Sequence, residues 1–461
     1  MKSDIILIKN GIVVTMNPSI GIIKNGAVAI EGDKILDVGN SERLKKEYKT
    51  DIVVDASGMA VLPGLINTHV HLYQNLLKGL NDDSALVEWL KRTLYPLRHV
   101  ESKKVMSGDF RVGYYGALMA CLEMIRSGTT CFVSMDEPNP WICGAIEETG
   151  IRGFYGITLR DRWTPKDAML PIEKQLEIAT ETIRKWHGSE GGRIKCMIAP
   201  TTPFACSEEL LLESEKMSDK FGLRLSIHIS ETPYEVKLVK KEKGRRPVEF
   251  LDKINFLSPK VLAAHCIWVS EKEIKILKER EVKVSHNPES NMKLGSGVAP
   301  IPRMLKEGIT VSLATDGAAS NDNLDMFEAI RTSALLHKLA SQDPSVISAE
   351  KVMQMATIDA ARAIGEENRI GSIEAGKKAD LILINLKKPH LQPIHDVVKT
   401  LVYCANGSDV EMTIVDGKII FKNGRILGVN EGRIIREAEE VVRAALMEAE
   451  EYLPKASWLR S

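Results

Sequence analysis

Apolar runs of strand length alternate with amphipathic helical stretches between about residues 60 and 370. This alternation is typical of a parallel sheet whose strands are joined by crossover helices. Apolar residues with helical spacing predict helices over 109–126, 172–186 and 325–338. Eight strand-like runs can be counted, and eight such units predict a (β/α)₈ TIM-like barrel. The expected strands cover residues 61–67, 128–134, 152–159, 194–199, 223–229, 261–264, 282–285 and 310–314.

The two ends of the chain have a different texture from the middle. Residues 4–56 alternate short β-rich runs with Gly, Asn and Asp turns, and residues 379–428 repeat this pattern. Because neither set is long enough to bury a large core alone, the two ends are expected to pair as one discontinuous β-sandwich. The predicted organisation is a sandwich of residues 1–59 and 372–430, a barrel of residues 60–371 and a helical tail of residues 431–461.

Composition excludes several classes of partner. The chain has 461 residues, 44% of them hydrophobic and 27% charged, which is ordinary for a globular protein. Lys and Arg number 62, as do Asp and Glu, so the zero net charge indicates neither nucleic acid nor an anionic membrane as partner. No signal-peptide core, no apolar run of about 18 residues and no Cys-x-x-Cys pair is found. We therefore expect a cytoplasmic protein with a small-molecule substrate.

The apolar run that starts at Val61 ends in His69-Val-His71. Alternate residues of a strand share a face, so the two imidazoles point the same way while Val70 points back into the packing. One strand can in this way offer two nitrogen ligands to a metal. The alternative is that two core histidines happen to be close in sequence, and for an isolated pair that interpretation would be reasonable.

Later strands argue against this alternative, because ionisable residues follow them as well. The active sites of (β/α)₈ barrels are built at the carboxyl ends of the strands. A single strand-end histidine could be a satisfied core residue, but four such placements on one rim are improbable as accidents of packing. The residues that end or follow expected strands five to eight are His228, Glu231, His265, His286 and Asp316.

Ligand chemistry suggests roles for these side chains. Three imidazoles and one carboxylate, from His69, His71, His228 and Asp316, form a set suited to a single Zn²⁺ or Fe²⁺ ion. Such a cation lowers the pKa of a water that it binds, which makes hydroxide available at neutral pH. Asp316 could also accept the proton of this water. Glu231 is placed to protonate a substrate ring nitrogen, and His265 could hold the water or stabilise developing charge.

With these residues the chain resembles the amidohydrolase superfamily. The similarity is strongest to its branch of methylthioadenosine and S-adenosylhomocysteine deaminases, with the related triazine and guanine aminohydrolases, and it covers essentially the whole length. It rests on the motifs Pro63-Gly-Leu-Ile-Asn-Thr-His-Val-His71, His228-Ile-Ser-Glu-Thr, His286-Asn-Pro-Glu-Ser-Asn-Met-Lys-Leu, Thr315-Asp-Gly-Ala-Ala-Ser-Asn and Gly371-Ser-Ile-Glu-Ala-Gly-Lys-Lys-Ala-Asp380.

The resemblance implies a metal-dependent hydrolase that releases an exocyclic ring amine as ammonia. It places the family's metal ligands on His69, His71, His228 and Asp316. The same comparison puts the proton-transfer glutamate on Glu231 and the substrate-side histidine on His265. It implies one divalent metal per chain, Zn²⁺ or Fe²⁺, and association into a homo-oligomer.

Two substrate-side positions depart from the resembling branch. There, a Glu that binds ribose hydroxyls follows a Trp-Leu helix and a Pro, whereas here Tyr95-Pro-Leu is followed by Arg98. A His near the sugar is likewise replaced by Thr201 in Ala-Pro-Thr. At position 98 a hydrogen-bond acceptor has become a donor. The sequence therefore predicts conserved aminohydrolase chemistry with an altered substrate end.

Two further residues have a functional and a structural interpretation. Trp89 could stack on a flat substrate ring or simply pack in a helix, and Arg160 could reach a substrate anion or form a surface salt bridge. Several activities remain open on this reasoning. They are deamination of a purine, pyrimidine, pterin or triazine, hydrolytic removal of chloride from a triazine, and the role of a non-catalytic barrel relative. The last would be marked by missing ligands, and none is missing.

Overall fold

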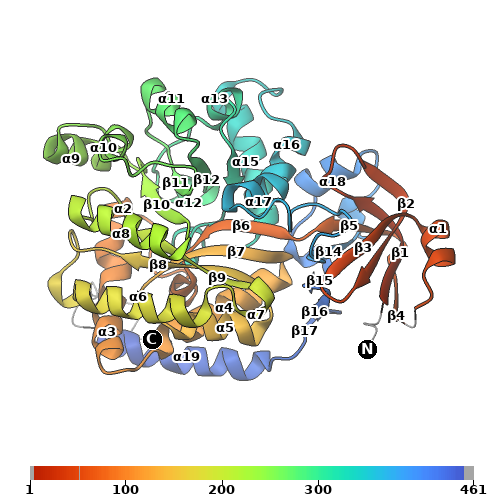
Figure 1. Cartoon of the computed structure of the whole chain (residues 1–461), viewed down its shortest axis with the longest axis horizontal. Helices are drawn as coiled ribbons and strands as arrows, with labels where there is room; N and C mark the ends of the chain where they lie inside the picture. The colour runs from red at the N-terminus through yellow and green to blue at the C-terminus, as the bar shows by residue number, and fades with distance from the viewer. Residues whose placement is uncertain (1–4, 51, 451–461) are drawn as a thin grey trace.

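The computed structural model describes residues 5–50 and 52–450. Within this part of the chain the larger sheet has eight strands, which pair in parallel in chain order (Figure 1). The predicted (β/α)₈ barrel is confirmed. Its strands are β6 (Leu65–Val70), β7 (Thr129–Asp136), β8 (Arg152–Leu159), β9 (Ile194–Pro200), β10 (Leu225–Ile229), β11 (Val261–His265), β12 (Lys283–His286) and β13 (Val311–Leu313).

Hydrogen bonds between the first and last strand regions close the ring. The Asp316 backbone N–H donates to the His69 carbonyl at 3.0 Å, and the Thr68 hydroxyl donates to the Leu313 carbonyl at 3.0 Å. The Asn67 side chain donates to Thr315 Oγ1 at 2.7 Å. This seam brings the His-x-His motif of the first strand next to the aspartate that follows the last one.

The barrel strands are covered on both faces, as parallel strands in such folds must be. Every residue of β6, β7 and β8 is buried, which explains why these segments are apolar throughout rather than alternating. The three helices predicted from helical spacing are confirmed as α4 (Arg111–Arg126), α6 (Ile172–Trp186) and α15 (Met326–Ser341). Other helices around the barrel include α5 (Trp141–Thr149), α8 (Glu208–Phe221), α9 (Pro233–Lys243), α10 (Pro247–Lys253), α11 (Glu271–Glu279), α12 (Pro288–Lys293), α13 (Ile301–Lys306), α16 (Ala349–Met355) and α17 (Ile358–Ile364).

Both ends of the chain contribute to one mixed nine-stranded sheet, as expected (Figure 1). The two ends meet where β5 pairs antiparallel with β14, with Val61 opposite Leu383. Side chains from both ends, among them Val28 and Ile414, share one apolar cluster. The strands are β1 (Ile5–Val14), β2 (Ile22–Glu31), β3 (Lys34–Asn40), β4 (Ile52–Asp55), β5 (Met59–Pro63), β14 (Leu381–Asn385), β15 (Val410–Val415), β16 (Lys418–Lys422) and β17 (Arg425–Ile426).

The boundary expected for the first barrel strand was wrong. The apolar run 61–67 is two strands, because β5 belongs to the end sheet and only β6 belongs to the barrel. Gly64 separates them at a place where the chain passes very close to β7. A Cβ atom at this position would lie 1.9 Å from Thr130 Oγ1, so only glycine fits. The continuous hydrophobicity hides the change of sheet.

The expected C-terminal helix is present as α19 (Glu431–Glu448), and residues 451–461 lie outside the described part of the chain. This helix lies along α3 (Tyr95–Met106) and α4 (Figure 1). Its polar anchors are Glu437, which accepts a hydrogen bond from Tyr115 at 2.9 Å, and Glu431, which pairs with Arg126 at 2.6 Å. In the described residues no helix has the length and apolar character needed to cross a membrane.

A buried ion pair joins the barrel to the end sheet. Arg152, at the start of β8, is 1% exposed and donates to both carboxylate oxygens of Asp380 at 2.7 and 3.0 Å. It also contacts Asp416, in the turn between β15 and β16. The side chain thus connects residues from the middle and the C-terminal part of the chain.

Replacing Arg152 with Met is expected to lower the free energy of unfolding by about 3–5 kcal/mol, because removal of one partner leaves Asp380 buried without a cation. Urea unfolding followed by circular dichroism measures this change. The control is Arg280→Met, which removes an exposed pair with Asp252 and should cost at most about 1 kcal/mol. Equal losses in the two variants would show that the buried pair does not stabilise the joint.

Candidate active site

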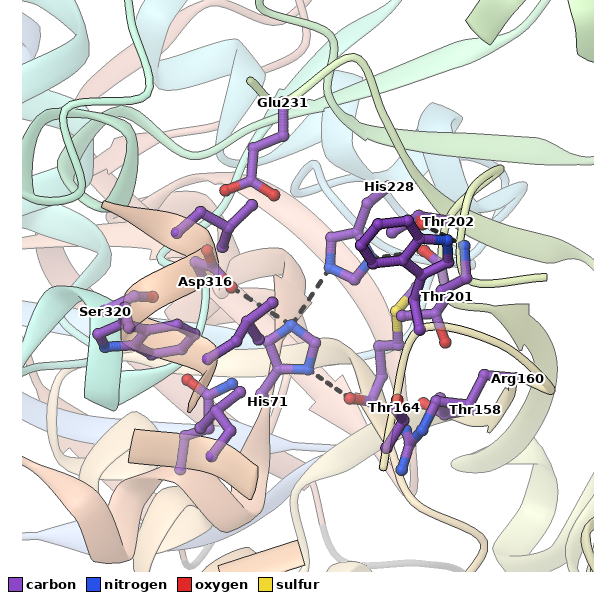
Figure 2. Close-up of a pocket in the computed structure, with 18 of the residues that line it drawn as sticks. His71, Thr158, Arg160, Thr164, Thr201, Thr202, His228, Glu231, Asp316 and Ser320 are labelled. Atoms are coloured by element: carbon purple, nitrogen blue, oxygen red, sulfur yellow. Dashed lines mark hydrogen bonds and ion pairs between the residues drawn. The ribbon is translucent and has the colours of Figure 1, made fainter. Parts of the chain in front are cut away.

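A cavity opens at the carboxyl ends of the barrel strands, which is where (β/α)₈ barrels bind small molecules. Its wall includes the predicted site residues His71, His228, Glu231, His265 and Asp316. Figure 2 shows the His71 ring facing both Asp316 and His228. The structure thus gathers side chains from β6, β10, β11 and the end of β13 at one place.

Two imidazoles of this group present unprotonated nitrogens to each other. Nδ1 of His71 contacts the Met135 carbonyl, and Nδ1 of His228 lies 2.7 Å from the Thr201 carbonyl. Because a carbonyl can only accept, each Nδ1 carries the proton and each Nε2 carries a lone pair. The two Nε2 atoms lie only 3.3 Å apart. Facing lone pairs at this distance are suited to sharing a cation.

His69 and Asp316 complete the group. His69 is fully buried and neither of its ring nitrogens has a hydrogen-bond partner. Asp316 Oδ1 lies 3.5 Å from His69 Nε2 and 3.4 Å from His71 Nε2. The other carboxylate oxygen accepts a hydrogen bond from Ser290 Oγ at 2.7 Å, which fixes the orientation of the group. An orphaned buried imidazole beside a buried carboxylate fits a divalent metal.

Burial keeps the imidazoles of His71 and His228 neutral, which is the protonation state that binds a metal ion. It lowers the pKa of His71 to about 4 and lowers the pKa of His228 well below its ordinary value, so both rings are neutral at pH 7. Burial alone would raise the pKa of Asp316, but the contact with His69 holds that pKa well below its usual range. Neutral imidazoles and an ionised carboxylate could bind a divalent ion without first losing protons.

Glu231 and His265 lie on the same side of the cavity. His265 Nε2 is 3.8 Å from Glu231 Oε2 and 3.9 Å from Asp316 Oδ2, and Asn291 Oδ1 lies 2.9 Å from His265 Nδ1. Burial raises the pKa of Glu231, which favours a protonated carboxyl group in this position. The carboxylate of Glu235 accepts the backbone N–H groups of residues 230 and 231 at 2.8 Å each and holds the loop that carries Glu231.

The backbone at three of these strand ends is in the left-handed region that non-glycine residues rarely adopt. The φ angles are 53° at Ser230, 69° at His265 and 64° at Asp316. Such conformations cost of order 1 kcal/mol or more each and cluster at functional sites. They turn the chain sharply after the strand, so that the side chains point into the cavity.

The predicted substrate-side residues also reach the cavity. Trp89, Arg98, Arg160 and Thr201 all line it. Trp89 is 4% exposed, packs in an apolar cluster and donates its indole N–H to the Ala319 carbonyl at 3.2 Å, so it both packs and faces the cavity. The Thr201 hydroxyl donates to the Leu159 carbonyl at 3.1 Å. Arg160 does form a salt bridge, but the surface position expected for it was wrong, because this residue is 2% exposed.

Arg160 is buried because a carboxylate that the sequence analysis missed lies beside it. Both guanidinium nitrogens Nη1 and Nη2 donate to Glu137, and Nε of Arg98 lies 3.3 Å from the same carboxylate. Glu137 directly follows β7, so the strand-end argument used for the other residues could have found it. The Met135 and Thr201 carbonyls were missed as well, and they have no side-chain signature.

Comparison with known proteins agrees with this geometry. The model of the Amidohydrolase family matches residues 60–420. The chain belongs to the Amidohydrolase family. One relative, a 5'-deoxyadenosine deaminase of Methanosarcina acetivorans, is 44% identical over 444 residues, covering 95% of this chain and 99% of its own. A 5-methylthioadenosine/S-adenosylhomocysteine deaminase of Desulforudis audaxviator is 40% identical over 443 residues, covering 95% and 98%.

Solved structures of this family share the fold. An adenosine deaminase from Xanthomonas campestris with bound zinc is 28% identical and superposes with a TM-score of 0.89, covering 96% of this chain and 99% of its own. The expected resemblance to the amidohydrolases is thus confirmed over nearly the whole chain.

Proposed function

We propose that this chain is a metal-dependent deaminase that replaces the exocyclic amine of an adenine-type ring with a carbonyl oxygen and releases ammonia. The observation that carries the proposal is the convergence of His71, His228 and Asp316 beside Glu231 at one cavity, with the buried His69 in contact with this group. The two relatives described above are named for the deamination of adenine nucleosides. The predicted ligand and catalytic roles remain part of this proposal.

His69, His71, His228 and Asp316 would hold the metal ion, with Zn²⁺ or Fe²⁺ suited to their nitrogen and oxygen donors. When bound there, a divalent ion makes hydroxide available at neutral pH. The Met135 and Thr201 carbonyls keep His71 and His228 in the tautomer that a ligand requires. Outer contacts of this kind matter because they fix both the protonation and the direction of each ring.

The remaining groups move protons. Asp316 is positioned to take up the proton of the attacking water, and Ser290 orients its carboxylate for that purpose. Glu231 is positioned to deliver a proton to the ring nitrogen next to the reacting carbon. His265, within 4 Å of both carboxylates, is suited to hold the water and to stabilise the developing negative charge. As the carbon–oxygen double bond forms, Glu231, which has given its proton to the ring, takes up the hydroxyl proton and passes it to the amine, which leaves as ammonia.

The apolar mouth of the cavity suits a flat ring such as adenine. Apolar side chains of α2 (Leu86–Trp89) and of the following turn Leu90–Leu94 form one wall, and Phe204 and Trp163 line it as well. Flat rings stack well on such aromatic surfaces.

Metal removal and a substrate panel test the proposal. Purified protein is expected to contain about one transition-metal ion per chain, to release ammonia from at least one adenine nucleoside, and to lose this activity with a chelator and regain it with Zn²⁺. Elemental analysis and an ammonia assay measure both properties. If no aminated ring releases ammonia and a chlorinated triazine releases chloride, the proposal would be replaced by that of a chlorohydrolase.

A further inference from the structure

We infer that Arg98 and Arg160 form an oxyanion subsite, which binds a carboxylate or a phosphate on the part of the substrate remote from the reacting amine. This inference rests on the proposed function, because it names the substrate class that the same cavity accepts. It depends on Arg98 in the first turn of α3, on Arg160 directly after β8, and on the carboxylate of Glu137 between them.

The first argument is charge. Glu137 contacts both guanidinium groups, so one negative charge faces two positive charges that cannot be removed by titration. Two other carboxyl groups stand nearby, but burial raises the pKa of Asp136 to about 7 and that of Glu101 to about 8. At neutral pH these groups do not supply a full compensating charge. The cluster therefore has a positive excess.

The second argument is that the excess positive charge faces the cavity. Arg98 and Arg160 both line the cavity, whereas Glu137 does not. The carboxylate lies behind the two guanidinium groups and fixes them, and the surface offered to a substrate consists of donors. Such a wall suits an acceptor-only group such as a carboxylate or phosphate better than a hydroxyl.

The third argument is a hydrogen-bond inventory of Arg98. Its Nη2 donates to the Tyr73 hydroxyl at 3.1 Å and its Nε faces Glu137, but Nη1 has no partner among the described residues. The residue as a whole is 8% exposed and lines the cavity, but Nη1 is not among its fully buried unpaired atoms, so this nitrogen is accessible. A donor that no protein group occupies at the cavity wall can bind a ligand oxygen.

The subsite lies at the far end of the cavity from the proton-transfer group. Figure 2 shows Arg160 near Thr158 and Thr164, well apart from Glu231, with the His71 and His228 rings between them in this view. A purine ring held against Glu231 would therefore direct its sugar or substituent toward Arg98 and Arg160. In the branch that the sequence resembles, a Glu that binds ribose hydroxyls stands where this chain has Arg98. This replacement supports the subsite, because it removes a hydrogen-bond acceptor at this end of the substrate.

Three adenine nucleosides that differ only at the 5' position test the inference. They are 5'-deoxyadenosine, which is neutral, the 5'-carboxylate of adenosine, and adenosine 5'-monophosphate. The variant is Arg98→Met, which keeps an unbranched apolar side chain and removes the guanidinium group and its charge. The matched control is Arg162→Met, because Arg162 follows β8 as Arg160 does, but pairs with Glu242 and does not line the cavity. Arg98→Lys serves as a partial rescue.

We expect the wild-type kcat/KM to be at least about tenfold higher for one anionic nucleoside than for 5'-deoxyadenosine. Arg98→Met should lower this value by about 10- to 100-fold, chiefly through KM, and should leave 5'-deoxyadenosine within about threefold. Arg98→Lys should recover part of the loss, and Arg162→Met should change nothing. Whether the carboxylate or the phosphate is preferred identifies the source of the oxyanion.

An equal preference for neutral and anionic nucleosides in the wild type and in Arg98→Met would overturn the subsite while leaving the deaminase proposal intact. If none of the three compounds releases ammonia, their binding affinities measured by calorimetry still test the subsite. Tighter binding of an anionic nucleoside that Arg98→Met abolishes supports the subsite, and equal affinities refute it. Circular dichroism melts confirm that each variant is folded.

Discussion

Replacement of Asp316 with Asn should lower kcat for ammonia release by about 10³-fold or more. The amide keeps the shape of the side chain and can still contact Ser290, but it cannot take up a proton at the atoms that face His69 and His71. Steady-state kinetics with elemental analysis of the same samples measures turnover and metal content together. We expect the three imidazoles to retain at least part of the metal.

The control for this variant is Asp219→Asn, an equal change at an exposed position of α8, which should leave turnover unaffected. Turnover near the wild-type rate in Asp316→Asn would exclude this residue as proton acceptor. Loss of turnover together with all of the metal would instead assign it a role in binding alone.

Replacement of Glu231 with Gln should lower kcat by about 10²- to 10⁴-fold for an amine substrate, because an amine leaves readily only after a proton has been delivered. Chloride needs no proton to leave. A 6-chloropurine nucleoside should therefore be hydrolysed by the variant with a much smaller loss than its 6-amino counterpart. Parallel assays of ammonia and chloride release give the ratio of the two losses.

Glu279→Gln, on the exposed face of α11, is the matched control and should not alter either rate. Similar losses for the amine and the chloride would mean that Glu231 acts only on the ring nitrogen or on the water and passes no proton to the leaving amine. The loop contacts of Glu235 would then need to be tested as the cause, since they hold Glu231 in place.

The strand-end histidines were predictable because two rules apply to them at once. A buried parallel strand is continuously apolar, and its carboxyl end faces the active site. His228 and His265 interrupt such runs, so their positions in the ring followed from the sequence. The boundary at Gly64 did not follow, because a change of sheet within one apolar run leaves no change of hydrophobicity.

The substrate side was less predictable, because it depends on contacts between side chains of different loops. Arg160 looked like a surface residue until the fold placed Glu137 beside it, and Arg98 gained its significance from the same neighbour. The Thr201 carbonyl orients His228, yet any residue has a carbonyl there. Residue types alone contain no information about such backbone acceptors.

The seam between β6 and β13 has a consequence for how the protein becomes active. Asp316 and His69 are joined by a backbone hydrogen bond, although almost the entire barrel separates them along the chain. During synthesis on the ribosome, a chain released before its eighth strand could bury much apolar surface and still lack Asp316, one of the four proposed metal ligands. We therefore expect activity to appear only when the last strand has docked against the first, so that an active chain is one whose barrel is complete.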